Sequence, residues 1–310
     1  MTHILVTGGA GFIGCNFVRA AVSNGYGVTV LDKLTYAGNK KNFSGLGANF
    51  IKGDITKKSD VEKSMKGTDI VVNFAAETHV DRSISDAGPF INTNVFGTYT
   101  LLEASVKANV KKFVHISTDE VYGSAVKGFF KETDTLNPRN PYSATKAAAE
   151  HIVYSYAITH GLPAVITRSS NNFGPYQNNE KFIPKLITNS MTNKPLPIYG
   201  KGENIRDWIY VEDNCEAIIS VIERGKNGEV YNIGGGNEHK NIEISKMILN
   251  ILKKPLSLIQ FVPDRKGHDF RYALDTQKIR ALGWKPLYKF EDALKKTILW
   301  YKDNRWFWKL

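Results

Sequence analysis

The stretch that decides the fold is residues 3–32, HILVTGGAGFIGCNFVRAAVSNGYGVTVLD. Its pattern is typical of a strand, a glycine turn, a helix, a second strand and a terminal acid. These parts are, in order, His3–Thr7, the glycines Gly8, Gly11 and Gly14, a helical run to about Asn24, the run Gly27–Leu31, and Asp32. Glycines at this spacing let the backbone approach a pyrophosphate at a helix N-terminus. The stretch therefore predicts a unit that binds a dinucleotide, with a purely structural turn as the alternative.

The acid that ends this stretch indicates which dinucleotide is bound. A carboxylate at Asp32 accepts hydrogen bonds from a ribose hydroxyl and repels a 2′-phosphate, so NAD is expected rather than NADP. Asp54 follows the third predicted strand, where its side chain either reaches the adenine or caps the next helix. The expected cofactor-binding residues are Gly8, Gly11, Phe12, Ile13, Gly14, Asp32, Lys33, Thr35, Asp54, Ile55, Ala75 and Ala76, together with Tyr142 and Lys146.

Strand and helix patterns continue to alternate along the chain. The further strand-like runs are Asn49–Ile55, Asp69–Ala76, Lys112–Thr118 and Ala164–Ser169, and the main helical patterns between them are Pro89–Ala108 and Tyr142–His160. Alternation at this spacing predicts an α/β fold with a doubly wound parallel (Rossmann) sheet. After residue 170 the rhythm changes, so we expect a cofactor domain over residues 1–170. Residues 171–310 are expected to form a smaller mixed α/β substrate domain, with some segments returning to the main sheet.

Composition excludes several classes of protein. The 310 residues are 42% hydrophobic and 23% charged, which is ordinary for a globular protein. The formal net charge is +11, but the basic residues are scattered as pairs without a nucleic-acid-binding motif, so no nucleic-acid partner is expected. No apolar run reaches the ~18 residues of a membrane span and no leader is visible, which favours the cytoplasm and no membrane partner. Cys15 and Cys215 form neither a disulfide framework nor a metal-ligand spacing, and no metal site is expected.

A second stretch, residues 115–146, carries the residues suited to catalysis: HISTDEVYGSAVKGFFKETDTLNPRNPYSATK. Asp119 and Glu120 are adjacent carboxyls at the end of a predicted strand, where chemistry gathers in open α/β sheets. Tyr142 and Lys146 are four residues apart and so share one face of a helix. These four groups are expected to meet at one small molecule. The alternatives are a core tyrosine beside a solvated lysine, and a carboxyl pair that serves as a helix cap and a surface acid.

The glycine turn and the Tyr142-x-x-x-Lys146 pair resemble the extended short-chain dehydrogenase/reductase family over essentially the whole chain. Within that family the sequence is similar to the nucleotide-sugar 4,6-dehydratases, most closely those that act on dTDP-glucose. The motifs that carry this similarity are Asp32–Gly38 (DKLTYAG), Ala75–Ser83 (AAETHVDRS), Ser117–Gly123 (STDEVYG), Asn171–Tyr176 (NNFGPY), Arg206–Trp208 (RDW) and Asp264–Asp269 (DRKGHD). The sister 4-epimerases usually carry small or hydrophobic residues where this chain has the acidic pair.

The resemblance implies a role for each catalytic residue. Tyr142, with its pKa lowered by Lys146, would take the proton of the sugar 4-hydroxyl while hydride passes to NAD, and Thr118 would orient that hydroxyl. Glu120 would remove the proton on carbon 5, and Asp119 would protonate the leaving 6-hydroxyl. The hydride would then return to carbon 6, so that NAD is regenerated.

The same resemblance implies the other partners. Residues expected to contact the nucleotide-sugar substrate are Glu77, Thr78, Asn171, Lys181, Arg206, Asn241, Arg265 and His268. Structural hydrogen bonding is the alternative for Glu77, and an ordinary surface position is the alternative for each of the others from Asn171 onward. A homodimer is expected. The remaining alternatives are a UDP-glucose 4,6-dehydratase, a UDP-sugar 4-epimerase or decarboxylase, and a non-catalytic NAD-binding regulator.

Overall fold

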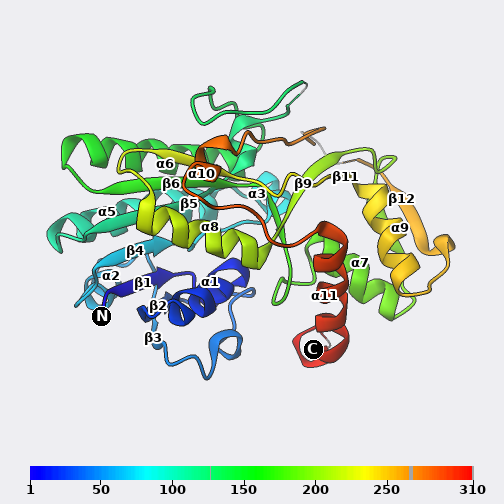
Figure 1. The fold of residues 1–310 in the computed structure, drawn as a ribbon, viewed down its shortest axis with the longest axis horizontal. Helices are drawn as coiled ribbons and strands as arrows, with labels where there is room; N and C mark the ends of the chain where they lie inside the picture. The colour runs from blue at the N-terminus through cyan, green and yellow to red at the C-terminus, as the bar shows by residue number, and fades with distance from the viewer. Residues whose placement is uncertain (126, 265–267, 309–310) are drawn as a thin grey trace.

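A computed structural model of the chain describes residues 1–125, 127–264 and 268–308 (Figure 1). Its centre is a seven-stranded sheet in the order β10-β6-β5-β4-β1-β2-β3, in which all neighbouring strands are parallel. The strands are β1 (His3–Thr7), β2 (Gly27–Asp32), β3 (Asn49–Lys52), β4 (Ile70–Asn73), β5 (Lys112–Thr118), β6 (Ala164–Ser169) and β10 (Val230–Ile233). The strand order reverses between β1 and β4, and ligands of such sheets bind at this point.

Helices cover both faces of this sheet (Figure 1). On one face α1 (Phe12–Ser23) packs beside α8 (Val211–Arg224). The other face carries α2 (Lys58–Ser64), α5 (Thr98–Lys107) and α6 (Pro141–Thr159). The alternation of β1 explains the two layers, because Ile4 and Val6 join the core under α1 while Leu5 joins the opposite core. A parallel strand buried on both faces is expected to be continuously apolar, as the buried middle of β1, Ile4 to Val6, is.

Residues after the sixth strand build most of a second body. It contains two small sheets, ordered β11-β9-β7 and β12-β8, and a core of its own. Its elements are β7 (Asn171–Phe173), α7 (Phe182–Met191), β8 (Leu196–Tyr199), β9 (Ile205–Tyr210), β11 (Glu238–Lys240), α9 (Asn241–Ile251), β12 (Ile259–Val262) and α11 (Phe290–Asp303). Two elements after residue 170 return to the first body: β10 pairs with β6 in the main sheet, and α8 packs in the core beneath it. The α/β doubly wound fold is confirmed, while the boundary at 170 stays a prediction.

The structure shortens some of the expected elements. The runs predicted over 49–55 and 69–76 form strands only as Asn49–Lys52 and Ile70–Asn73, because both segments then turn to line the cavity described below. The helix expected over 89–108 consists of α4 (Gly88–Phe90), a π-helical segment and α5. Two further short helices are α3 (Val80–Ser85) and α10 (Gln277–Arg280). Among the described residues, no helix is both long and apolar enough to cross a membrane.

Candidate active site

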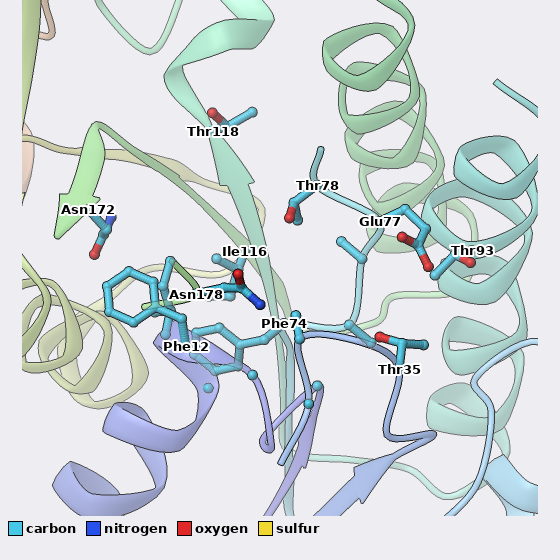
Figure 2. Close-up of a pocket in the computed structure, with 18 of the residues that line it drawn as sticks. Phe12, Thr35, Phe74, Glu77, Thr78, Thr93, Ile116, Thr118, Asn172 and Asn178 are labelled. Carbon is cyan, nitrogen blue, oxygen red and sulfur yellow. The ribbon is translucent and has the colours of Figure 1, made fainter. Parts of the chain in front are cut away.

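A cavity of about 330 Å³ lies where the strands β1, β2, β4 and β5 end (Figure 2). Thr118 at the end of β5 and Phe12 at the start of α1 both border it. All fourteen expected cofactor residues line this cavity, as do all five expected catalytic residues: Gly8, Gly11, Phe12, Ile13, Gly14, Asp32, Lys33, Thr35, Asp54, Ile55, Ala75, Ala76, Thr118, Asp119, Glu120, Tyr142 and Lys146. Residues that the sequence argument drew from distant motifs therefore meet at one site.

The glycine turn is packed too closely for any side chain. Gly8 has a φ of +68°, and a Cβ there would lie 2.7 Å from the Ala75 nitrogen. A Cβ on Gly14 would lie 2.3 Å from the Gly8 oxygen. The turn therefore brings bare backbone and the N-terminus of α1 to the cavity, which suits an anionic pyrophosphate.

Asp32 is held in place by the backbone around it. Its Oδ2 accepts a hydrogen bond from the Ala10 nitrogen at 3.0 Å and its Oδ1 accepts one from the Leu34 nitrogen at 2.7 Å. Burial raises the pKa of this carboxyl, and the two backbone donors oppose that shift. A carboxylate fixed at the end of β2 suits a ribose hydroxyl.

Asp54 is not the N-cap of the next helix. Its Oδ1 accepts hydrogen bonds from the Thr56 nitrogen and hydroxyl, both at 2.9 Å, whereas α2 begins after Lys57. Its Oδ2 lies 3.6 Å from the Lys33 ammonium. Asp54 thus stabilises the turn after β3 while its side chain borders the cavity, in the region where an adenine contact was expected.

The helix α6 places Tyr142 and Lys146 on the cavity wall. Both side chains are buried, and the Lys146 Nζ donates a hydrogen bond to the Ile116 carbonyl at 2.5 Å. Burial lowers the pKa of Lys146 to about 8. Burial also raises the pKa of Tyr142, and the charge of Glu120 raises it further. The net pKa of Tyr142 is therefore raised and not lowered as expected, because burial and the neighbouring carboxyl outweigh any stabilisation of the phenolate by Lys146.

The two adjacent carboxyls have different surroundings. Asp119 is 3% exposed, and its Oδ2 has no hydrogen-bond partner within the described ranges. Burial raises the pKa of Asp119 well above its usual range, and the charges of Glu120 and Asp207 add to this effect. The Glu120 carboxylate, by contrast, accepts a hydrogen bond from the Asn140 side chain at 3.4 Å. Asp119 thus tends to stay protonated beside a carboxylate, which suits an acid and base pair.

The expected substrate residues fall into two groups. Glu77, Thr78, Asn171 and Lys181 line the cavity, and the Lys181 Nζ donates to the Thr78 carbonyl at 3.0 Å. The others lie outside the described lining. Their positions, in chain order, are β9 for Arg206, the first residue of α9 for Asn241, and the segment after β12 for His268. Arg265 lies outside the described residues.

Arg206 and His268 are occupied by contacts within the protein. The Arg206 guanidinium donates to the Asp269 carbonyl at 2.8 Å and lies 4.2 Å from the centre of the Tyr272 ring. The His268 Nδ1 lies 2.6 Å from the Asp264 Oδ1. Direct substrate contacts by either residue stay a prediction.

Several residues that line the cavity were not expected from the sequence. These are Leu31, Tyr36, Ala37, Gly38, Gly53, Phe74, Thr93, Ile116, Ser117, Ser169, Ser170, Asn172, Gln177, Asn178 and Glu180. Tyr36 and Asn172 lie inside quoted motifs, so a signal for them existed. Thr93 comes from the π-helical segment and Asn178 from a loop, and Figure 2 shows both at the cavity. No local pattern marks either residue, because only the packing of distant segments brings them there.

Comparisons with known proteins agree with this geometry. The family model described as GDP-mannose 4,6 dehydratase matches residues 5–297. The chain is 52% identical to the low-salt glycan biosynthesis protein Agl12 of Haloferax volcanii, over 96% of this chain and 98% of that protein. It is 49% identical to a dTDP-glucose 4,6-dehydratase of Streptomyces niveus, over 99% of this chain and 95% of that protein.

The fold is also similar to a solved structure. The crystal structure of DesIV, a dTDP-glucose 4,6-dehydratase from Streptomyces venezuelae with NAD bound, superposes with a TM-score of 0.97. The sequences are 45% identical, and the match covers 99% of each chain. The chain therefore belongs to the GDP-mannose 4,6 dehydratase family, within the extended short-chain dehydrogenases/reductases.

Proposed function

We propose that this chain is a lyase that uses tightly bound NAD to convert dTDP-glucose into its 4-keto-6-deoxy sugar by loss of water. The observation that carries the proposal is the buried Asp119 beside Glu120, in the same cavity as Tyr142 and Lys146. A tyrosine and a lysine alone suit an oxidation at carbon 4. Elimination of water needs an acid and a base in addition, and the carboxyl pair supplies both. Relatives and a solved structure named as dTDP-glucose 4,6-dehydratases support the choice of substrate.

The residues present fit NAD. The close-packed turn at Gly8 and Gly14 leaves room only for backbone against a pyrophosphate, and Asp32 offers a fixed carboxylate to a ribose. When bound, NAD accepts a hydride from carbon 4 of the sugar and later returns it to carbon 6.

The chain's own groups move the protons. Tyr142 accepts the proton of the 4-hydroxyl, and Thr118, whose hydroxyl is 3.3 Å from the Asp119 Oδ1, orients the sugar beside the pair. The buried ammonium of Lys146 stabilises the phenolate that forms. Glu120 then removes the proton on carbon 5, which the 4-ketone has made acidic. Asp119 gives its proton to the 6-hydroxyl, which leaves as water. As the hydride is returned to carbon 6, Glu120 gives its proton back to carbon 5, which completes the 4-keto-6-deoxy sugar.

This arrangement separates the proposal from its rivals. A 4-epimerase or decarboxylase performs no elimination across carbons 5 and 6 and has no use for a buried acid beside a base. A non-catalytic regulator would not need Tyr142 and Lys146 together on the cavity wall. A UDP-glucose 4,6-dehydratase shares the chemistry and differs only in the nucleobase of the substrate, uracil in place of thymine.

The test of the function is the mass of the product. Incubation with dTDP-glucose should lower the mass of the nucleotide sugar by one water, whereas epimerisation leaves the mass unchanged. Because the hydride returns within one cycle, no free NADH should accumulate during turnover. Parallel assays with UDP-glucose compare kcat/KM for the two nucleotide sugars. A product of unchanged mass, or a stoichiometric build-up of free NADH, would exclude a dehydratase.

We also propose a homodimer formed by the outer faces of α5 and α6. These adjacent helices expose large apolar side chains, namely Ile91, Phe96 and Tyr99 from the α5 side and Tyr154 and Ile158 from α6. Apolar groups gathered on one face are typical of an interface.

Ile158→Glu should therefore convert the dimer to a monomer in light scattering at micromolar concentration, because it places a charge in the apolar interface. Leu287→Glu is the matched control, since Leu287 is 74% exposed, compared with 67% for Ile158, and its nitrogen donates to Asp213 of α8. A wild-type protein of monomeric mass would contradict the dimer.

We place the protein in the cytoplasm. Both cysteines, Cys15 and Cys215, are free and buried, as expected in a reducing compartment. Burial raises the pKa of Cys15 to about 12, which keeps this thiol unreactive.

A further inference from the structure

Asn140 touches both the catalytic helix and the catalytic carboxylate. It is 8% exposed and is the N-cap of α6, two residues before Tyr142. Its Oδ1 accepts a hydrogen bond from the Ser143 nitrogen at 2.9 Å, and its Nδ2 donates to the Glu120 Oε2 at 3.4 Å. A single amide thus joins the helix start to the group proposed as the base.

The chemistry of the cap fixes which way this amide faces. The Ser143 nitrogen is a donor, so only the amide oxygen can face it. The NH₂ group must then face Glu120, and it can only donate. A carboxylate with a fixed donor keeps its charge more easily than one without a donor.

The segment that carries Asn140 is held against the segment that carries Glu120. The Asn137 nitrogen donates to the Val121 carbonyl at 2.9 Å. A Cβ on Gly123 would lie 2.6 Å from the Asn137 oxygen, so the two backbones touch. The amide therefore has little freedom to leave the carboxylate.

We propose that Asn140 is a positioning residue that keeps Glu120 ionised and so assigns the role of base to Glu120 and the role of acid to Asp119. The two carboxyls are adjacent and interact, so a small difference in their surroundings decides which one holds the proton. Asp119 is buried and receives one donor, the Thr118 hydroxyl at Oδ1, while its Oδ2 receives none among the described residues. Glu120 is only half-buried and receives the amide donor of Asn140. This inference rests on the proposed function of the same site.

Other charged and titratable groups also face Glu120. The negative charge of Glu120 raises the pKa of Asp119, of Tyr142 and of Tyr272, which lies in the segment after β12. The same charge stabilises the ammonium of Lys181, which precedes α7. Each of these groups is unchanged when Asn140 is replaced, so a shift on replacement reports on the amide.

The test uses two variants that keep the helix cap, Asn140→Ser and Asn140→Asp, since serine and aspartate are both good N-caps. Loss of one donor should raise the pKa of Glu120 by about half a unit to one unit in Asn140→Ser. Asn140→Asp replaces the donor by a negative charge and should raise it further. The base must be ionised, so the acidic limb of the rate of deuterium exchange at carbon 5 should move to higher pH by the same shift. Formation of enzyme-bound NADH should stay near its wild-type rate.

A direct titration keeps this inference separate from the proposed function. The pKa of Glu120 is measured by NMR on protein labelled with carbon-13 at the glutamate carboxyls, with Glu120→Gln identifying its signal. This readout needs no turnover. A wild-type protein that does not dehydrate the sugar would contradict the proposed function, while the pKa of Glu120 could still be measured. A purely structural Asn140 would change thermal stability or kcat at every pH without moving the limb. An unchanged Glu120 pKa in Asn140→Ser and in Asn140→Asp overturns the inference.

Discussion

A Glu120→Gln variant is expected to oxidise dTDP-glucose and then stop. Glutamine keeps the shape of the side chain but cannot accept the proton on carbon 5, so elimination has no base. Tyr142 and Lys146 are unchanged on α6, so hydride transfer to NAD should survive. Enzyme-bound NADH should appear in a single-turnover absorbance trace and persist. Mass spectrometry in heavy water should find no deuterium at carbon 5.

This result has a matched control in a glutamate away from the site. Glu212 on α8 is an acid outside the described cavity lining, and Glu212→Gln should leave dehydration unchanged. Dehydration by Glu120→Gln at a rate near that of the wild type would mean that the base lies elsewhere. The assignment of the acidic pair would then be wrong.

An Asp119→Asn variant should slow dehydration by about 10²–10⁴-fold, which is the usual contribution of general acid catalysis. Asparagine keeps the size of the side chain and can still hydrogen-bond the leaving hydroxyl, but it cannot protonate it. Burial already shifts the pKa of this carboxyl upward, toward its neutral form, so the fold should tolerate the change.

The two variants are distinguished by exchange at carbon 5. Asp119→Asn retains the Glu120 base, so it should form NADH and exchange deuterium while it eliminates slowly. In the wild type, dehydration should fall as the pH rises through the raised pKa of Asp119, because only the protonated carboxyl is an acid. If Asp119→Asn eliminates as fast as the wild type, another group protonates the leaving hydroxyl.

Much of the fold and of the cofactor site could be predicted from local sequence. Glycines at positions 8 and 14 predict a tight turn, because the backbone there packs too closely for a side chain. The strand before the turn and the helix after it follow from the periods of their apolar residues. Tyr142 and Lys146 share a face of α6 for the same local reason. The nicotinamide cofactor, the dehydratase family and the parallel sheet were all within reach of these patterns.

The sequence by itself determined that the glycine turn, the acidic pair and the Tyr142 and Lys146 pair face one cavity, because spacing along one helix or at the end of one strand places a side chain without knowledge of the rest of the chain. The tertiary structure decided what state each group is in. Asp119 is pushed toward its protonated form partly by Asp207, which β9 brings in from far along the chain. Asn140 meets Glu120 across a loop, and burial raises the pKa of Tyr142 where the motif suggested the opposite. Desolvation and the fields of distant charges depend on contacts between remote segments, so no local pattern encodes them.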